Sequence, residues 1–334
     1  MTGVSTRPLI SVIVPVRNNA MGIAHVLACL EIQTLAADYF EVIIADDGSQ
    51  PGQVPQVDSP EGRLRMVRCP PRTSYAARNT ASLSARGAVL AFCDSDCLPD
   101  PRWLEEGLAA AAGAELAAGQ VVFVPPAQPT LWSLLTIDMF LDQERDVRQS
   151  CAVTANLFVH RALFERLRGF DESLASGGDY DLVYRAVKAG ARLVYAERAT
   201  VRHPTMDTGR ELLKKVWYTN YWAGVRAARR PGFQAPRLAR RGSIIPVAGS
   251  LRARLFAARP WFGLHRPRLL ASGVSPSVWD DVRATFLIQT LISCVAGLGR
   301  FAGWWKGRAM DRKGSGPIYL KRQDRPDSVD LRLG

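Results

Sequence analysis

Hydrophobic runs and polar turns alternate in a regular order along the first hundred residues. Four short apolar runs, the first of them rich in β-branched residues, have the composition of strands in a buried parallel sheet. Two intervening segments, 21–34 and 74–85, are expected to be helical from their apolar spacing. Strand, helix and strand of this length form right-handed βαβ units, so the pattern predicts a nucleotide-binding α/β half. The predicted strands are 9–15, 41–45, 64–67 and 89–93.

The pattern continues past residue 100 with two further helices and two further strands. We expect Asp100 to cap a helix over 101–112, because proline is tolerated at the first helical position and acidic residues follow it. Glycines bound a second helix, over 180–189, which Gly190 closes. The strands expected here are 120–124 and 153–159.

Polar clusters follow three of the predicted strands. They are Pro15 to Asn18, Asp46-Asp47 and Asp94-Ser95-Asp96. Because the carboxyl ends of parallel strands meet at one edge of a sheet, these side chains are expected to lie close together around a ligand. Taken alone, the stretch Asp46 to Ser49 is also typical of a turn held by Asx hydrogen bonds. Three clusters at successive strand ends favour a ligand site.

The carboxylates of Asp94 and Asp96 are separated by one residue after a buried strand. Two carboxylates held close together repel each other unless a cation lies between them. Mg²⁺ typically takes one or two carboxylates together with substrate phosphates, so the pair suggests a metal-held phosphate ligand. A turn followed by a helix cap would use the same residue types, and the motif alone does not decide between the two.

Charge divides the 334-residue chain into two unequal parts. Residues 202–334 carry 25 Lys and Arg against 8 Asp and Glu, a net of +17, whereas residues 1–201 carry 18 against 23, a net of −5. An acidic front half joined to a basic tail indicates two tasks. Such a tail suits nucleic acid or an anionic membrane surface, and charge alone does not choose between them.

The cysteines and the N-terminus indicate a reduced environment. The six cysteines form no paired framework, and Cys93 and Cys97 have no neighbouring His or second Cys pair that would complete a zinc site. Residues 1–8 are polar and lack the apolar core of a signal peptide. We therefore expect the catalytic half to stay in the cytoplasm.

The motifs and their order resemble those of the family 2 glycosyltransferases, which have the GT-A fold. The resemblance covers roughly residues 9–205 and rests on five motifs in sequence. They are Ser11 to Pro15, Asp46-Asp47-Gly48-Ser49, Ala77-Arg78-Asn79, Asp94-Ser95-Asp96, and Gly169 to Glu172 together with Gly178 to Leu182.

The resemblance implies a role for the residues at the strand ends. Asp47 would bind the nucleotide base, Arg78 would approach the base or the phosphates, and Asp94 with Asp96 would hold a divalent metal, Mg²⁺ or Mn²⁺, on the diphosphate. Asp96 would be the direct ligand, and His203 would lie beside the metal. The other residues implied in donor binding are Pro15, Val16, Asn18 and Ser95.

By the same resemblance, Asp179 would be the base that takes the proton from the attacking acceptor hydroxyl. Many family members have Glu immediately before this position, where the present chain has Gly178. Thr154, Asn156 and Asp181 are placed near the acceptor, although the first two are equally compatible with ordinary strand residues and Asp181 with helix stabilisation.

The basic tail combines cations with aromatic and apolar side chains. The segment 210–230 has an amphipathic pattern that suits an interface between water and lipid headgroups. The run 284–299 is uncharged for 16 residues, fewer than the roughly 20 that a membrane span needs, which favours a monotopic or re-entrant helix. A packed cytosolic helix is the plainer alternative, and the tryptophans fit a lipid surface better than nucleic acid.

The sequence therefore predicts an inverting, metal-dependent GT-A glycosyltransferase with a basic helical extension. It would move a sugar from a nucleotide diphosphate, UDP favoured, to a hydroxyl of a lipid-linked or cell-envelope glycan, at the inner face of the cell membrane. A non-catalytic nucleotide-sugar-binding scaffold that docks through its tail is the alternative. The expected divisions are a flexible N-terminus (1–8), the GT-A domain (9–205), a membrane-associating helical region (206–312) and a flexible tail (313–334).

Overall fold

The computed structural model describes residues 8–57, 59, 62–229, 261–283, 288–312 and 315–320. An eight-stranded sheet has the order β3-β2-β1-β4-β7-β6-β8-β5. The strands β1 to β4 are parallel to one another, and β7 runs antiparallel to β4 and to β6. The strands are β1 (Ile10–Val16), β2 (Phe40–Asp46), β3 (Leu64–Arg68), β4 (Val89–Cys93), β5 (Leu98–Pro99), β6 (Leu116–Val124), β7 (Asn156–His160) and β8 (Leu193–Pro204).

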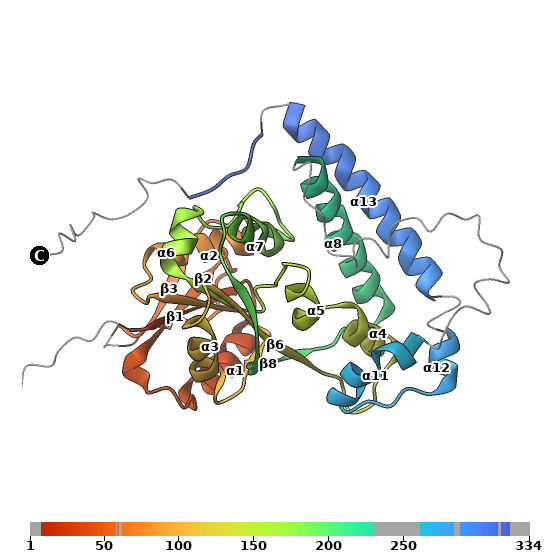
Figure 1. The fold of residues 1–334 in the computed structure, drawn as a ribbon, viewed down its shortest axis with the longest axis horizontal. Coiled ribbons are helices and arrows are strands. Elements are labelled where there is room, and N and C mark those ends of the chain that lie inside the picture. The colour runs from red at the N-terminus through yellow and green to blue at the C-terminus, as the bar shows by residue number, and fades with distance from the viewer. Residues whose placement is uncertain are drawn as a thin grey trace, which may run out of the picture.

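Helices cover both faces of the sheet, and a separate group lies at one side of it (Figure 1). The helices of the sheet domain are α1 (Ala20–Glu31), η1 (Ala37–Tyr39), α2 (Ser74–Leu83), α3 (Trp103–Ala111), α6 (Arg161–Arg166) and α7 (Gly178–Lys188). The group at the side comprises α4 (Leu131–Met139), α5 (Gln143–Val147), α8 (Gly209–Arg229), α11 (Trp261–Ala271), α12 (Val278–Arg283) and α13 (Gln289–Arg312).

The central strands are buried on both faces, as their continuous apolar sequence predicts. In β4, Ala91 and Cys93 belong to the core under α1 and α3, whereas Leu90 and Phe92 belong to the core on the opposite face. There the Phe92 ring packs 5.6 Å from the ring of Phe164. The alternation fixes the register of the strand, because a slip by one residue would exchange the two sets.

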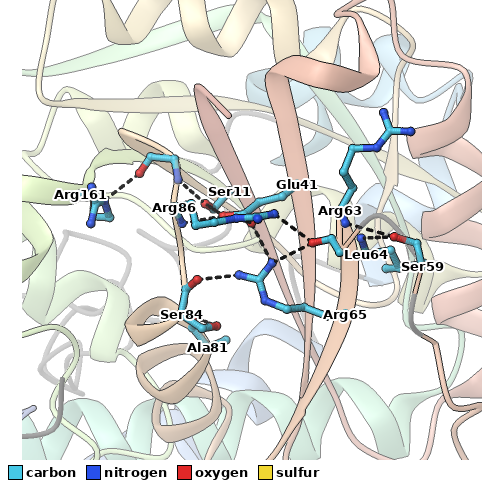
Figure 2. Close-up of polar contacts among 12 residues, drawn as sticks. Ser11, Glu41, Ser59, Arg63, Leu64, Arg65, Ala81, Ser84, Arg86 and Arg161 are labelled. Atoms are coloured by element: carbon cyan, nitrogen blue, oxygen red, sulfur yellow. Dashed lines mark hydrogen bonds and ion pairs between the residues drawn. The ribbon is translucent and has the colours of Figure 1, made fainter. Parts of the chain in front are cut away.

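One polar group is buried in the middle of the sheet. Glu41 is fully buried and accepts hydrogen bonds from Ser11 Oγ (2.6 Å), Arg65 Nη1 (2.7 Å) and Arg86 Nε (2.7 Å), as Figure 2 shows. Burial by itself raises the pKa of Glu41, but the bonds from Arg65, Ser11 and Arg86 bring this pKa below its ordinary value.

Replacing Glu41 with glutamine is expected to lower the free energy of unfolding at neutral pH by about 2–4 kcal/mol, because the arginines lose their anionic partner. A carboxyl with a lowered pKa stabilises the fold above its unfolded pKa, and this contribution disappears as the pH falls through its folded pKa. Urea unfolding of wild type and variant should therefore differ at neutral pH and converge in acid. Glu197→Gln, at an exposed position of β8, is the control and should be neutral.

The helix after the acidic motif begins later than predicted, and the prediction that Asp100 caps it is wrong. Helix α3 starts at Trp103 with no side-chain cap. Leu98 and Pro99 pair with β8, which brings the Asp100 carboxylate to 3.1 Å from Arg202 Nε. Asp100 thus anchors the edge of the sheet.

Helices α8 and α13 run side by side at the edge of the molecule, separated in sequence but closely packed (Figure 1). The contact is made by glycines: a Cβ at Gly303 would lie 1.7 Å from the carbonyl oxygen of Tyr221, and one at Gly224 would lie 2.1 Å from that of Arg300. Much of the uncharged run 284–299 therefore packs against protein, although residues 284–287 lie outside the described part. Within the described residues, no helix has the length and apolar content to cross a membrane.

The two ends of the chain were predicted to be flexible. Residues 1–7, 313–314 and 321–334 lie outside the described residues. Residues 315–320, by contrast, lie against the sheet domain: Glu172 N donates to Ile318 O (2.7 Å), and Leu320 N donates to Arg168 O (3.1 Å). The guanidinium of Arg185 stacks on the Tyr319 ring at 4.7 Å. These contacts hold this part of the predicted tail in place.

Candidate active site

A cavity of about 740 Å³ opens at the carboxyl ends of β1, β2 and β4. One part of its wall comes from these strand ends and from α2, and the other part comes from α7, the α4–α5 segment, α8 and α13. Of the residues predicted to form the site, those lining the cavity are Pro15, Val16, Asp47, Arg78, Asp94, Ser95, Asp96, Thr154 and Asp179. The structure therefore brings together carboxylates that are 132 residues apart in sequence, from Asp47 to Asp179.

The two neighbouring acids after β2 have different surroundings. Asp46 Oδ1 accepts a hydrogen bond from Ser49 N (2.9 Å), which is the turn-forming Asx bond. Asp47 instead lines the cavity, where its Oδ1 accepts from Arg72 N (2.8 Å) and its Oδ2 lies 3.8 Å from Arg17 Nη1. The turn explanation thus holds for the first acid, and the second is available to a ligand.

Arg78 lies almost fully buried in the wall of the cavity and forms an ion pair with Asp94. Its guanidinium also lies over the ring of Tyr75, 5.6 Å from the centroid. Asp94 was predicted to hold a metal together with Asp96, but in this structure its charge is balanced by Arg78. Asp94 as a metal ligand stays a prediction: Arg78 pairs with its Oδ1, so the ion would have to bind Oδ2 or displace Arg78.

Asp96 and His203 form the better candidate metal site. Among the described residues, Asp96, Cys97 and His203 place one potential ligand atom each within 4.8 Å of the others. His203 Nε2 lies 3.6 Å from Asp96 Oδ2, and the Asp96 carboxylate is about half exposed. The Cys97 thiol is a poorer donor, because a hydrogen bond with Cys93 and burial hold its pKa well above the ordinary value. Asp96 lines the cavity, whereas His203 lies behind it and outside the cavity wall. A carboxylate oxygen and an imidazole nitrogen so placed fit a divalent ion that completes its shell with phosphate and water.

Asp179 lies at the start of α7, and its carboxylate accepts three hydrogen bonds. Tyr75 Oη donates to Oδ1 (3.2 Å), Tyr180 N donates to Oδ1 (2.9 Å) and Thr154 N donates to Oδ2 (3.3 Å). Burial raises the pKa of Asp179, and these backbone bonds together with Arg78 and Arg226 counteract the rise only in part. A carboxylate with a raised pKa is a stronger proton acceptor than an exposed one, which suits a general base.

The glycine before α7 allows a residue from the C-terminal part of the chain to reach this loop. Gly177 has a φ of 74°, and a Cβ on it would lie 1.7 Å from Arg226 Nη1. Arg226, on α8, donates from Nη1 to the carbonyl of Gly177 (3.0 Å) and lies over the Tyr180 ring at 5.7 Å. A helix outside the sheet domain thus helps to position the candidate base.

Two residues predicted near the acceptor, Asn156 and Asp181, do not line the cavity, and a place for them near the acceptor stays a prediction. Asn156 is fully buried behind the sheet, where it accepts from Trp103 Nε1 (2.8 Å) and donates to Ala199 O (2.7 Å). Asp181 is also fully buried and pairs with Arg185 Nε at 2.8 Å. Both are polar residues whose hydrogen-bonding groups are used inside the fold.

Asn18 also lies outside the cavity wall, contrary to the role predicted for it in donor binding. Its Oδ1 accepts from Gln50 N (2.8 Å), and its own N donates to Ser49 Oγ (2.9 Å). With a φ of 54°, it joins the turn after β1 to the turn after β2. Its function is to shape the loops that present Asp47.

Sequence reasoning missed several residues of the cavity wall. Tyr75 lies one helical turn before Arg78 on α2 and could have been found from that spacing. Asp146 and Arg226 lie in charged segments in which nothing in the sequence separates them from their exposed neighbours. The segment containing Arg226 was interpreted as a lipid-facing helix, whereas one of its sides lines the cavity.

The sequence of the chain is similar to those of known glycosyltransferases. Residues 11–167 match the model of the family described as glycosyl transferase family 2. The glycosyltransferase AglE of Haloferax volcanii is 36% identical over 220 residues, which are 63% of this chain and 71% of that protein. The pre-mycofactocin glycosyltransferase of Mycobacterium tuberculosis is 28% identical over 247 residues, covering 71% of this chain and 51% of its own.

Solved structures support the fold. The mannosyltransferase PcManGT from Pyrobaculum calidifontis, determined in complex with GDP-Man and Mn²⁺, superposes with a TM-score of 0.54 at 18% sequence identity. The match covers 90% of this chain and 87% of that one. The predicted GT-A fold, a mainly parallel sheet with flanking helices and a helical C-terminal region, is confirmed.

Proposed function

The chain belongs to glycosyl transferase family 2, and from that premise we propose that it is an inverting, metal-dependent enzyme that moves a sugar from a nucleotide diphosphate to an acceptor hydroxyl. The observation that carries this proposal is the convergence of Asp47, Asp96 and Asp179 on one cavity. Asp47 would hold the nucleotide base, Asp96 the diphosphate through a metal, and Asp179 the acceptor. Pro15, Val16, Ser95 and Arg78 line the same part of the cavity and would complete the donor site.

The reaction follows from the position and the raised pKa of Asp179. The acceptor oxygen attacks the anomeric carbon from the face opposite the diphosphate, and its proton passes to a carboxylate oxygen of Asp179. The bond between the anomeric carbon and the diphosphate oxygen breaks, and the electron pair leaves with the nucleoside diphosphate. A single displacement inverts the configuration at the anomeric carbon.

The residues beside the leaving group are suited to negative charge. Asp96 and His203 would hold the divalent ion, Mg²⁺ or Mn²⁺, which when bound would neutralise charge on the departing diphosphate. Arg78 is a buried cation in the wall of the same cavity. A bound diphosphate could draw its guanidinium away from Asp94. The relative PcManGT was solved with Mn²⁺, which supports a divalent ion of this kind.

The test is a screen of nucleotide sugars for metal-dependent release of nucleoside diphosphate, with and without membrane extract as the source of acceptor. The resemblance favours UDP-sugars, but PcManGT was solved with GDP-Man, so the screen includes donors with uracil and donors with guanine. Release that requires the extract and stops with EDTA supports the proposal. Nucleotide binding without release from any donor would instead favour the non-catalytic scaffold.

We further propose that the protein associates with the anionic inner face of the cell membrane, and helix α13 has a surface suited to this. Its outer face carries five apolar or weakly polar residues at alternating spacings of three and four, followed at the same spacing by Arg308 and Arg312. Leu298, Phe301 and Trp305 are each more than 60% exposed. The five residues, which we call the α13 stripe, are Leu291, Cys294, Leu298, Phe301 and Trp305. An apolar stripe that ends in cations matches a helix lying in the lipid interface.

Phe301→Glu is expected to reduce binding to vesicles of phosphatidylglycerol and phosphatidylcholine by about tenfold, since it removes an apolar contact and adds a repelled charge. Sedimentation with vesicles measures the effect. Ile32→Glu is the matched control, because Ile32 is 61% exposed against 67% for Phe301 but lies at the end of α1. Equal losses for both variants, or wild-type protein that stays in the supernatant, would contradict membrane association.

A further inference from the structure

The residues assigned to the donor line only part of the cavity. Its remaining wall is built by α7 of the sheet domain and by α5, α8 and α13 of the group at the side of the sheet (Figure 1). Asp179 belongs to this part through α7, so an acceptor whose hydroxyl meets Asp179 extends between these helices. The question is which chemistry this part of the wall would recognise.

Its polar feature is Asp146, a carboxylate that is 3% exposed and lies on α5. Asp146 Oδ2 accepts a hydrogen bond from Tyr180 Oη (3.0 Å), and Tyr180 follows Asp179 directly. Within the described part of the chain, no donor to Asp146 Oδ1 is found, and the residue lines the cavity. A buried carboxylate in a cavity wall, with a donor to only one of its oxygens, is costly unless water or a ligand donates to the other.

The apolar feature lies opposite, where α8 and α13 face the cavity. Val216 and Ala223 come from α8, and Ile292 and Ala296 come from α13. All four are at least nine-tenths buried and form an apolar strip, although polar residues of the same helices, among them Thr219, Asn220 and Ser293, also line the cavity. Such a surface binds the hydrocarbon part of a ligand.

We propose that these two features form an acceptor subsite for a glycoside with an apolar aglycone. While Asp179 takes the proton of the attacked hydroxyl, Asp146 Oδ1 accepts a hydrogen bond from a second hydroxyl of the same sugar, and the aglycone lies along the wall of α8 and α13. The inference rests on the proposed function and narrows its acceptor to a sugar. An acceptor with a single hydroxyl would leave Asp146 desolvated without a donor and is rejected for that reason.

The charges around Asp146 set the pH at which it can accept this bond. Burial raises the pKa of Asp146 to about 6, although the neighbouring Arg145 and the Tyr180 hydroxyl both favour the charged form. The other titratable or charged groups that interact with it are Asp142, Cys151, Asp179 and Arg268. Affinity for the acceptor should therefore fall as the pH drops through about 6.

The test offers octyl and methyl glycosides of glucose, galactose, mannose and N-acetylglucosamine as acceptors, together with the donor identified by the screen. 1-Octanol is the acceptor with a single hydroxyl. At least one octyl glycoside is expected to accept sugar with a KM about 10-fold or more below that of its methyl counterpart, because the octyl chain buries several methylenes. 1-Octanol should not react. Ile292→Ser should raise the KM of the octyl glycoside and leave that of the methyl glycoside unchanged.

Asp146→Asn is expected to raise the KM of that glycoside by about 10- to 100-fold, as the loss of a hydrogen bond to a charged group predicts, with donor affinity unchanged. The variant should also lose the fall in acceptor affinity near pH 6. Tyr180→Phe keeps the carboxylate but removes its donor, so the decline should move to higher pH. Glu144→Gln, on the same helix but paired with Arg148 at the surface, is the control and should change nothing.

The outcomes separate this inference from the proposed function. Donor-dependent release with membrane extract but with no octyl glycoside would show that the acceptor class is wrong. An unchanged KM and pH profile in Asp146→Asn, or transfer to 1-octanol, would likewise overturn the subsite while leaving the glycosyltransferase intact. Absence of release with every acceptor would overturn the proposed function and the subsite with it.

Discussion

Asp179→Asn is expected to lower the rate of sugar transfer by about 10²- to 10⁴-fold, the usual contribution of a general base. The asparagine keeps the volume of the side chain but cannot accept the proton of the acceptor hydroxyl. Donor affinity should stay within about twofold, because the residues proposed to bind the nucleotide come from β1, β2, α2 and β4. Single-turnover measurements and nucleotide titration distinguish the two effects.

The pH profile provides an independent measure of the same residue. Since burial raises the pKa of Asp179, the base form should be lost at a higher pH than for an exposed carboxyl, and the rate should fall on the acid side of that value. A buried carboxyl with a raised pKa destabilises the folded protein once it is ionised. Removal of this charge in Asp179→Asn offsets the loss of a hydrogen bond from the backbone, since the amide nitrogen cannot accept one. Urea unfolding of the variant at neutral pH, measured beside its rate, would exclude unfolding as the cause of inactivity.

Asp181→Asn is the matched control for Asp179, since it changes a buried aspartate two residues along the same helix. Asp181 pairs with Arg185 and does not line the cavity, so this variant should lose stability but keep its rate per folded molecule. Full activity in Asp179→Asn with the acceptor it normally uses would show that another group takes the proton.

The first hundred residues were predictable because their information is local. Buried strands of the parallel type are continuous apolar runs, and the polar residues that follow them are brought together by the topology of the sheet. Asp47, Arg78, Asp94 and Asp96 could thus be placed on one edge from sequence order alone. The structure adds the ion pair between Arg78 and Asp94, which depends on the position of α2 over the strand end.

The acceptor side could not be predicted in the same way, because its residues meet only through long-range packing. Asp146 gains its environment from Tyr180 on another helix, and Arg226 reaches the loop before Asp179 from α8. Asn156 was assigned to the site by the family resemblance, because the sequence alone did not distinguish it from an ordinary strand residue. In the structure its side chain instead accepts a hydrogen bond from Trp103 Nε1 and donates to two backbone carbonyls inside the fold.

Replacing Asp96 with asparagine is expected to abolish the effect of metal on donor binding and to slow transfer by about 10²- to 10³-fold, since the metal would contribute several kcal/mol of charge stabilisation. Titration of UDP and GDP should give the same affinity with Mn²⁺ as with EDTA in this variant, whereas wild type should bind more tightly with Mn²⁺. His203→Ala should cause a smaller loss, because the ligand that carries negative charge, Asp96, remains.

Variants of residues near Asp96 test whether the loss of the metal effect is specific to this carboxylate. Cys97→Ser should keep the metal effect, because the raised pKa of the buried thiol keeps it protonated. Asp100→Asn is the control carboxylate, since it pairs with Arg202 at the sheet edge and should leave nucleotide affinity unchanged. If Asp96→Asn kept tighter binding with Mn²⁺ and Asp94→Asn lost it, the metal would lie on Asp94, bound through Oδ2 or in place of Arg78.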